Sequence, residues 1–215
     1  MDVGLMLAFW VISLLLAFVP GADWSYAIGS GAQHRGNVVP AVSGMLTGHF
    51  AVTLVVAAGA AAVLTASPTA MIVLTTAGAL YLLWLGIHSL RHPVTVALTA
   101  GSAPSAGGRL FAKGFGISVL NPKVILLIMA MLPQFTSVAA PWPVGAQLVV
   151  LGLLHVANCA GVYFAVAYGA SAVLMSRPRA AKLVGAASAV VMILLGTLLM
   201  GEQVVELVAQ APHAG

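Results

Sequence analysis

Six long stretches of the chain are apolar and nearly free of charge. They cover residues 3–32, 38–66, 69–90, 110–132, 144–174 and 183–205. A helix needs about 20 apolar residues to cross a lipid bilayer, and each stretch meets that length. Only 6% of all residues are charged and 61% are hydrophobic, which leaves too little polar surface for a soluble domain. The sequence therefore predicts an all-α integral membrane protein with six transmembrane helices, the first of them retained rather than cleaved as a signal peptide.

The basic residues mark an orientation in the bilayer. They lie after the first, third and fifth apolar stretches: His34 and Arg35; Arg91, His92, Arg109 and Lys113; Arg177, Arg179 and Lys182. The other connections and both termini hold no Lys or Arg, so the positive-inside rule places both termini outside. The net charge of +4 is spread over these connections. We therefore expect a lipid bilayer as surroundings and no nucleic-acid partner.

The chain divides into two halves of three spans each. A linker rich in Pro, Gly and Ser covers residues 91–108, between residues 1–90 and 109–215. An odd number of spans in each half means that the halves enter the membrane from opposite sides, which predicts two inverted three-helix repeats.

The first span of each half carries a proline in its interior. The sequences are "FVPGADW" around Pro20 and "VLNPKVI" around Pro122, and each proline should kink or break its helix. Asn121 followed by Pro122 also has the pattern of an N-cap and first helical residue, and Pro20-Gly21 creates a similar point. Helices that restart there direct free N–H groups and a positive dipole end at an anion.

Asp23 and Lys123 are the only acidic and basic residues in the interior of the spans, since Lys113 and Glu202 lie within four residues of a span end. A charge near the bilayer centre costs at least about 2.5 to 3.5 kcal/mol on insertion scales, so both need each other or a ligand. One alternative is an ion pair that only fixes helix packing. The other is a substrate site, which the adjoining helix breaks favour. Burial disfavours an unpaired carboxylate, so Asp23 can hold a proton or a cationic group.

Other polar side chains within spans are candidates to line the same site, or to form hydrogen bonds between helices. They are Gln134, His49, His155 and Asn158. His155 and Asn158 are three residues apart and share a helix face. His49 and His155 could bind a metal together with Asp23, but no HxxxH or CxxC spacing involves them. We therefore expect no metal site and interpret Cys159 as a small buried apolar residue.

Gly44 and Gly48 form a small-xxx-small pair in the second span. Such a pair permits close helix packing inside the protein or in a homodimer.

Several motifs resemble the LysE/RhtB family of amino-acid exporters. They are "PGAD", "GAQHRG", "SGMLTGH", "AGALYLLWLGIHSLR" and "GFGISVLNPKVILLIMAMLPQF". By motif, the family's characteristic positions here are Pro20, Gly21, Asp23, Arg35, Gly36, Gly44, Gly48, Asn121, Pro122, Lys123, Pro133 and Gln134. One departure is Ala22, where the family usually has a second proline, and it weakens the expected first break.

The resemblance implies a bacterial inner-membrane protein that expels amino acids with the proton gradient as drive and no cofactor. We therefore predict a proton-coupled exporter of a neutral amino acid such as threonine, homoserine or leucine. Its substrate and proton site would comprise Pro20, Gly21, Asp23, His49, Asn121, Pro122, Lys123, Gln134, His155 and Asn158. The alternatives are an exporter of metal or other inorganic cations and, less favoured because no GxSG arrangement is present, an intramembrane enzyme.

Overall fold

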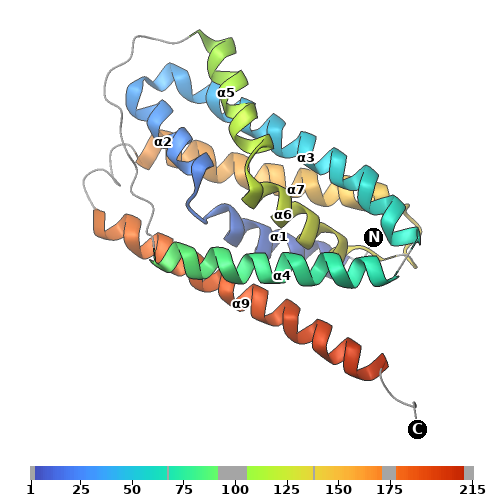
Figure 1. Ribbon diagram of the computed structural model, residues 1–215. Helices are drawn as coiled ribbons and strands as arrows, with labels where there is room; N and C mark the ends of the chain where they lie inside the picture. The colour runs from blue at the N-terminus through green and yellow to red at the C-terminus, as the bar shows by residue number, and fades with distance from the viewer. Residues whose placement is uncertain (1–2, 67, 92–105, 138, 171–177, 211–215) are drawn as a thin grey trace.

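The computed structural model describes residues 3–66, 68–91, 106–137, 139–170 and 178–210, and within these ranges the chain forms only helices and turns (Figure 1). This architecture confirms the predicted all-α class. Most of the predicted linker, residues 92–105, lies outside the described residues. The division of the chain into two halves at this linker therefore stays a prediction.

The helices follow the predicted apolar stretches closely. Before the linker they are α1 (Val3–Ala17), α2 (Ala22–Gln33), the 3-10 turn η1 (Arg35–Asn37), α3 (Val38–Ala66) and α4 (Pro68–Arg91). After it they are α5 (Gly107–Val119), α6 (Pro122–Met131), the 3-10 turn η2 (Leu132–Phe135), α7 (Val144–Ala165), the π-helical turn η3 (Val166–Ala170) and α9 (Pro178–Gln210).

Two of the apolar stretches are bent pairs of helices. The axes of α1 and α2 differ by 61°, and those of α5 and α6 by 55°. Pro20 lies in the first break and Pro122 begins the helix after the second. Both breaks are where the sequence predicts them, because a proline lacks the N–H that would continue the helical ladder. Ala22 in place of a second proline does not prevent the first break.

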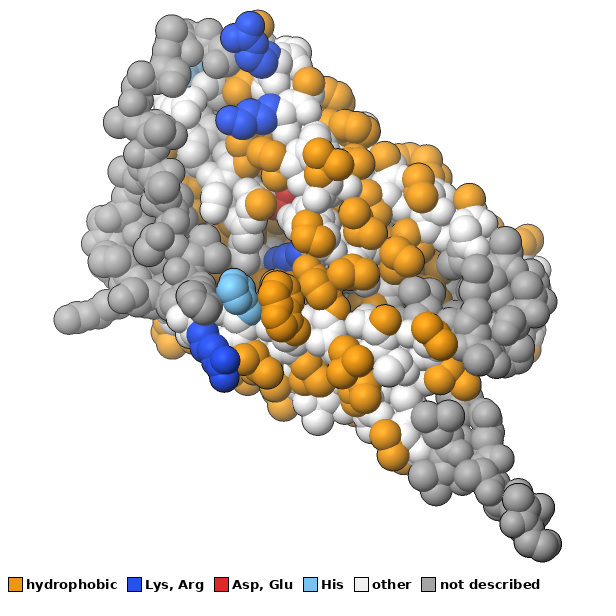
Figure 2. Space-filling view, viewed as in Figure 1, with side chains coloured by type: hydrophobic (Ala, Val, Ile, Leu, Met, Phe, Trp, Pro, Cys, Tyr) orange, Lys and Arg blue, Asp and Glu red, His pale blue; other side chains and the backbone are white. Residues whose placement is uncertain are grey.

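Two helical segments are long and apolar enough to cross a membrane by themselves, Arg35–Gly59 and Val144–Gly169. Counting each bent pair as one span raises the number to four. Large apolar side chains lie on the surface, among them Leu7, Val55 and Leu120 at 60%, 73% and 78% exposure, and Figure 2 shows such side chains spread over much of one face. A surface of this kind suits lipid. The count of six spans stays a prediction.

Helices α3 and α5 lie side by side with their backbones in contact (Figure 1). A β-carbon added at Gly44 would collide with the carbonyl of Phe111, and one added at Gly114 with the carbonyl of Ala41. A β-carbon at Gly48 would lie 2.8 Å from the β-carbon of Ser118. The Gly44 and Gly48 pair therefore packs inside the protein, against α5, and we call this contact the glycine seam.

One of the other long helices packs on α3, and the remaining two pack on each other. Helix α7 packs on both α3 and α1, and α4 packs on α9. The buried side chains at the centre are mostly apolar, and several of the buried polar ones, among them Asp23, His49, Ser118 and Tyr163, contact one another.

We expect Gly44→Ala to destabilise the protein by about 1 to 3 kcal/mol, the usual cost of overpacking a close contact. Gly59→Ala is the matched control on the same helix, because a β-carbon there meets nothing within 4 Å. It should leave stability unchanged or raise it by up to about 1 kcal/mol. Thermal unfolding of the detergent-solubilised variants, followed by helical circular dichroism, measures both. Equal melting temperatures would contradict the seam.

Candidate functional site

Asp23 lies in the first turn of α2, directly after the break at Pro20, and is only 4% exposed. Gly21 is the N-cap of this helix and offers no side-chain acceptor to its first amides. The N-terminal end of a helix stabilises negative charge. The break therefore supplies both the buried position of the carboxylate and part of the field that holds it.

Four side chains from three helices and the second break surround this carboxylate. Ser118 Oγ of α5 donates a hydrogen bond of 2.9 Å to Oδ1 of Asp23. Oδ2 lies 3.4 Å from Nδ2 of Asn121, 3.3 Å from the hydroxyl of Tyr163 on α7 and 3.5 Å from Nε2 of His49 on α3. One oxygen is thus held firmly by a single donor, and the other loosely by three.

Lys123 joins the second break to the backbone of the first. Its Nζ donates a hydrogen bond of 2.8 Å to the carbonyl of Val19, which lies in the break between α1 and α2. A backbone carbonyl freed in this way needs a donor from the protein at membrane depth. The side chain of Asn121 accepts from the backbone N–H of Lys123 at 3.0 Å, which confirms the predicted N-cap of α6.

Trp24 supplies a second donor to the first break. Its indole N–H donates to the carbonyl of Ala17, the last residue of α1, at 3.0 Å. Two backbone carbonyls at the first break, those of Ala17 and Val19, therefore accept hydrogen bonds from side chains.

Asp23 and Lys123 do not form a direct ion pair in the described part of the chain. The carboxylate of Asp23 is paired with His49 there, and the ammonium of Lys123 is directed at the carbonyl of Val19. The sequence left open whether the two charges pair directly. Lys123 instead stabilises the first break, and Asp23 contacts Asn121 at the second.

A second set of polar contacts lies beside the carboxylate, between α7 and α1. Ser13 of α1 hydrogen-bonds Nδ1 of His155 at 2.8 Å, and Asn158 donates to the same hydroxyl at 3.2 Å and to the carbonyl of Trp10 at 3.0 Å. His155 and Asn158 therefore share a helix face, as predicted, and both contact the hydroxyl of Ser13. The rings of His155 and His49 lie 5.4 Å apart between centroids, which links this set to Asp23.

The structure brings together most of the predicted site residues, but not Gln134. Pro20, Gly21 and Pro122 shape the breaks, while Asp23, His49 and Asn121 are in contact. Gln134 lies in η2 and donates to the carbonyl of Ala130. At about 1.5 Å per residue, it is roughly 18 Å along the helix from Pro122, which separates it from the carboxylate.

Three contacting residues were missed by sequence reasoning: Ser13, Ser118 and Tyr163. Two of them carried a usable signal. Ser118 precedes Asn121 by three residues, and Tyr163 follows His155 and Cys159 at intervals of four. Both spacings put side chains on one helix face. Ser13 carried none, because a lone serine in an apolar helix usually bonds its own backbone.

Comparisons with known proteins agree with this arrangement. The LysE type translocator family matches residues 14–203. The homoserine/homoserine lactone efflux protein of Salmonella typhimurium is 31% identical over 148 residues, which cover 68% of this chain and 70% of the relative. The cysteine/O-acetylserine efflux protein of Salmonella choleraesuis is 28% identical over 67% of this chain and 73% of the relative.

A leucine efflux protein of Enterobacter is 29% identical over 63% of this chain and 66% of the relative. No solved structure matches the chain. The family match covers most of the sequence, including both helix breaks and Asp23. The protein belongs to the LysE type translocator family.

Proposed function

We propose that this protein exports a small neutral amino acid from the cytoplasm in exchange for protons. The observation that carries the proposal is the buried carboxylate of Asp23, held at a helix break by side chains from both halves of the sequence. The relatives named above are efflux proteins for homoserine, leucine and cysteine or O-acetylserine. Their side chains are uncharged, and this supports a neutral substrate here.

The proposed architecture has six spans in two inverted repeats within the bacterial inner membrane, with both termini outside. It is supported by the order of elements, which is the same before and after residues 92–105: a bent pair, then two longer helices. Transporters built in this way bind their substrates at discontinuous helices near the midplane.

Asp23 would bind the α-ammonium of the substrate. Its Oδ2 has three contacts of 3.3 to 3.5 Å, whereas charge-assisted hydrogen bonds are usually about 2.7 to 2.9 Å long. An ammonium group can therefore replace a weaker partner at Oδ2 while Ser118 keeps Oδ1 in place. The imidazole of His49 is the partner that it would displace.

Lys123 would bind the α-carboxylate together with the first amides of α2. Its ammonium would exchange the carbonyl of Val19 for the stronger charged acceptor. Asn121 already caps one amide of α6, so that helix offers fewer free donors than α2, whose N-cap is glycine. His155 and Asn158 hold α7 against α1 beside this site, and Gln134 takes no part in it.

Competition for Asp23 would couple export to protons. A proton arriving from the acidic outer side neutralises the carboxylate and releases the ammonium of the substrate outward. When the site next faces the cytoplasm, the proton leaves and a new substrate binds. The step needs one group that holds either a proton or a cation, and Asp23 is that group.

We expect Asp23→Asn to abolish uphill export and to weaken substrate binding by about 30-fold or more, since a lost buried charge pair costs at least about 2 kcal/mol. Efflux from cells loaded with a panel of labelled amino acids, under an imposed proton gradient, measures this. Ser30→Ala is the matched control on α2, because its hydroxyl donates only to the carbonyl of Tyr26. Export by Asp23→Asn at the rate of the unaltered protein would contradict the proposal.

We expect Lys123→Met to remove the preference for a free carboxylate. The unaltered protein should bind an amino acid more tightly than its amide, which lacks the negative charge, and the variant should bind both alike. Competition against labelled substrate in proteoliposomes measures the ratio of the two affinities. Lys123→Arg, which keeps the charge, should retain a preference. An unchanged ratio in Lys123→Met would mean that other groups bind the α-carboxylate of the substrate.

A further inference from the structure

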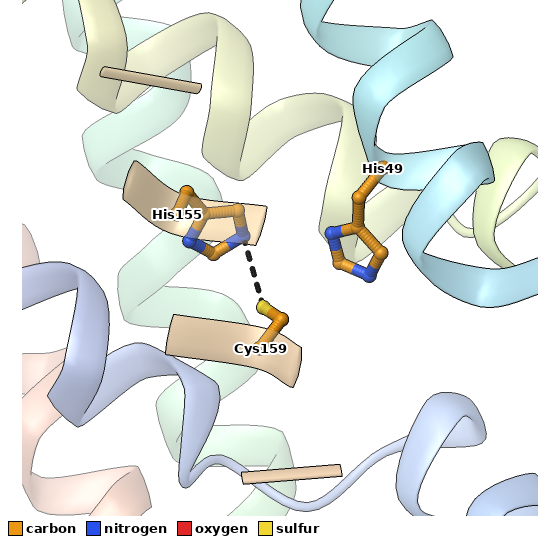
Figure 3. Close-up of side chains that lie close together, drawn as sticks. All are labelled: His49, His155 and Cys159. Atoms are coloured by element: carbon orange, nitrogen blue, oxygen red, sulfur yellow. Dashed lines mark hydrogen bonds between the residues drawn. The ribbon is translucent and has the colours of Figure 1, made fainter. Parts of the chain in front are cut away.

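Three side chains with metal-binding atoms meet beside Asp23, and none of them binds the substrate in the proposed transport step. They are His49 of α3 and His155 and Cys159 of α7, exposed to 2%, 3% and 0% (Figure 3). One ligand atom from each lies within 4.8 Å of the other two. Nε2 of His155 is 3.5 Å from Sγ of Cys159.

Each histidine has its other ring nitrogen already engaged. Nδ1 of His155 contacts Ser13 Oγ at 2.8 Å, and Nε2 of His49 contacts the carboxylate of Asp23 at 3.5 Å. If these nitrogens carry the protons, the remaining nitrogens present lone pairs. Metal-binding histidines are usually oriented in this way, by a hydroxyl, carbonyl or carboxylate behind them.

Nδ1 of His49 is buried and has no hydrogen-bond partner. Because Nε2 faces Asp23, Nδ1 is the nitrogen left for the cluster, and Figure 3 shows the ring of His49 directing a nitrogen toward His155. A buried polar atom without a partner is uncommon in a folded protein, and such an atom at a polar cluster is a candidate ligand for an ion.

We propose that His49, His155 and Cys159 form a binding site for one zinc-like divalent cation. Two imidazoles and a thiolate suit Zn²⁺, whereas Mg²⁺ and Ca²⁺ require oxygen ligands. With Zn–N near 2.0 to 2.1 Å and Zn–S near 2.3 Å, tetrahedral ligand atoms are roughly 3.3 to 3.6 Å apart. Small side-chain rotations close the cluster from its present spacing. Three protein ligands leave a fourth position open.

The charges around the cluster can balance the ion. The thiol of Cys159 loses its proton on binding, and the thiolate and Asp23 offset the two positive charges. Sequence spacing did not predict the cluster, because His49 lies on a different helix from the other two ligands.

Binding should also inhibit export. The ion would fix His49 in place and add positive charge next to Asp23, where the substrate ammonium and the proton compete. This consequence rests on the proposed exporter function, whereas binding of the ion does not.

Cobalt(II) titration of the purified, tag-free protein tests the site directly. Cys159 is the only cysteine in the chain, so a thiolate-to-cobalt charge-transfer band can come from no other residue. We expect one equivalent of Co²⁺ to give this band and one equivalent of Zn²⁺ to remove it. Zn²⁺ should also raise the melting temperature, since it binds the folded state.

Cys159→Ser should lose the band, and His155→Gln should lose it or weaken binding by more than Ser13→Ala does. Ser13→Ala removes only the group behind His155 and should weaken Zn²⁺ binding about 10- to 100-fold. His88→Gln, on α4, is the control histidine and should bind as the unaltered protein does. Folding of each variant is checked by circular dichroism.

Absence of the band in the folded, unaltered protein would overturn the site, and so would Zn²⁺ binding that survives in Cys159→Ser and His155→Gln together. Inhibition of amino-acid efflux by Zn²⁺ is measured separately. If Zn²⁺ binds and efflux is absent under all conditions, the export function fails while the metal site stands.

Discussion

A carboxylate enclosed by a chain this apolar must be satisfied by the protein itself, and the structure meets that demand at the two helix breaks. Asp23 needs donors that a continuous helix would not place around it, and the break at Pro20 brings it into reach of α3, α5 and α7. The break in turn frees carbonyls, which Lys123 and Trp24 satisfy. The buried charges and the broken backbone therefore satisfy each other's hydrogen bonds.

Much of this arrangement could be predicted from local pattern. Long apolar runs give the helix bounds, and a proline in mid-run gives the breaks at Pro20 and Pro122. The capping role of Asn121 also follows from its neighbour, since an Asx residue before proline starts a helix. Each of these inferences uses residues within one helical turn, where steric and hydrogen-bonding rules act directly.

Contacts between helices far apart in the sequence could not be predicted from the same patterns. Periodicity tells which residues share a face, but not which face of another helix they meet. Ser118, Tyr163 and Ser13 complete the polar contacts, yet their partners lie at least 95 residues away along the chain. Gln134 was included as a polar residue in an apolar stretch and as part of a family motif, and neither observation reports its distance from Asp23.

The close packing at the glycine seam also determines a distance at the carboxylate of Asp23. Ser118 donates the hydrogen bond to Oδ1 of Asp23 and lies on α5 opposite Gly48 of α3. Gly48 has no side chain to hold the two helices apart. Because Gly44 and Gly48 have no β-carbon, α3 and α5 lie close enough for Ser118 to keep its hydrogen bond to Asp23. Any substituent that widens the seam by even an ångström stretches a 2.9 Å contact beyond bonding range, so chemistry at Asp23 is sensitive to residues that never touch it.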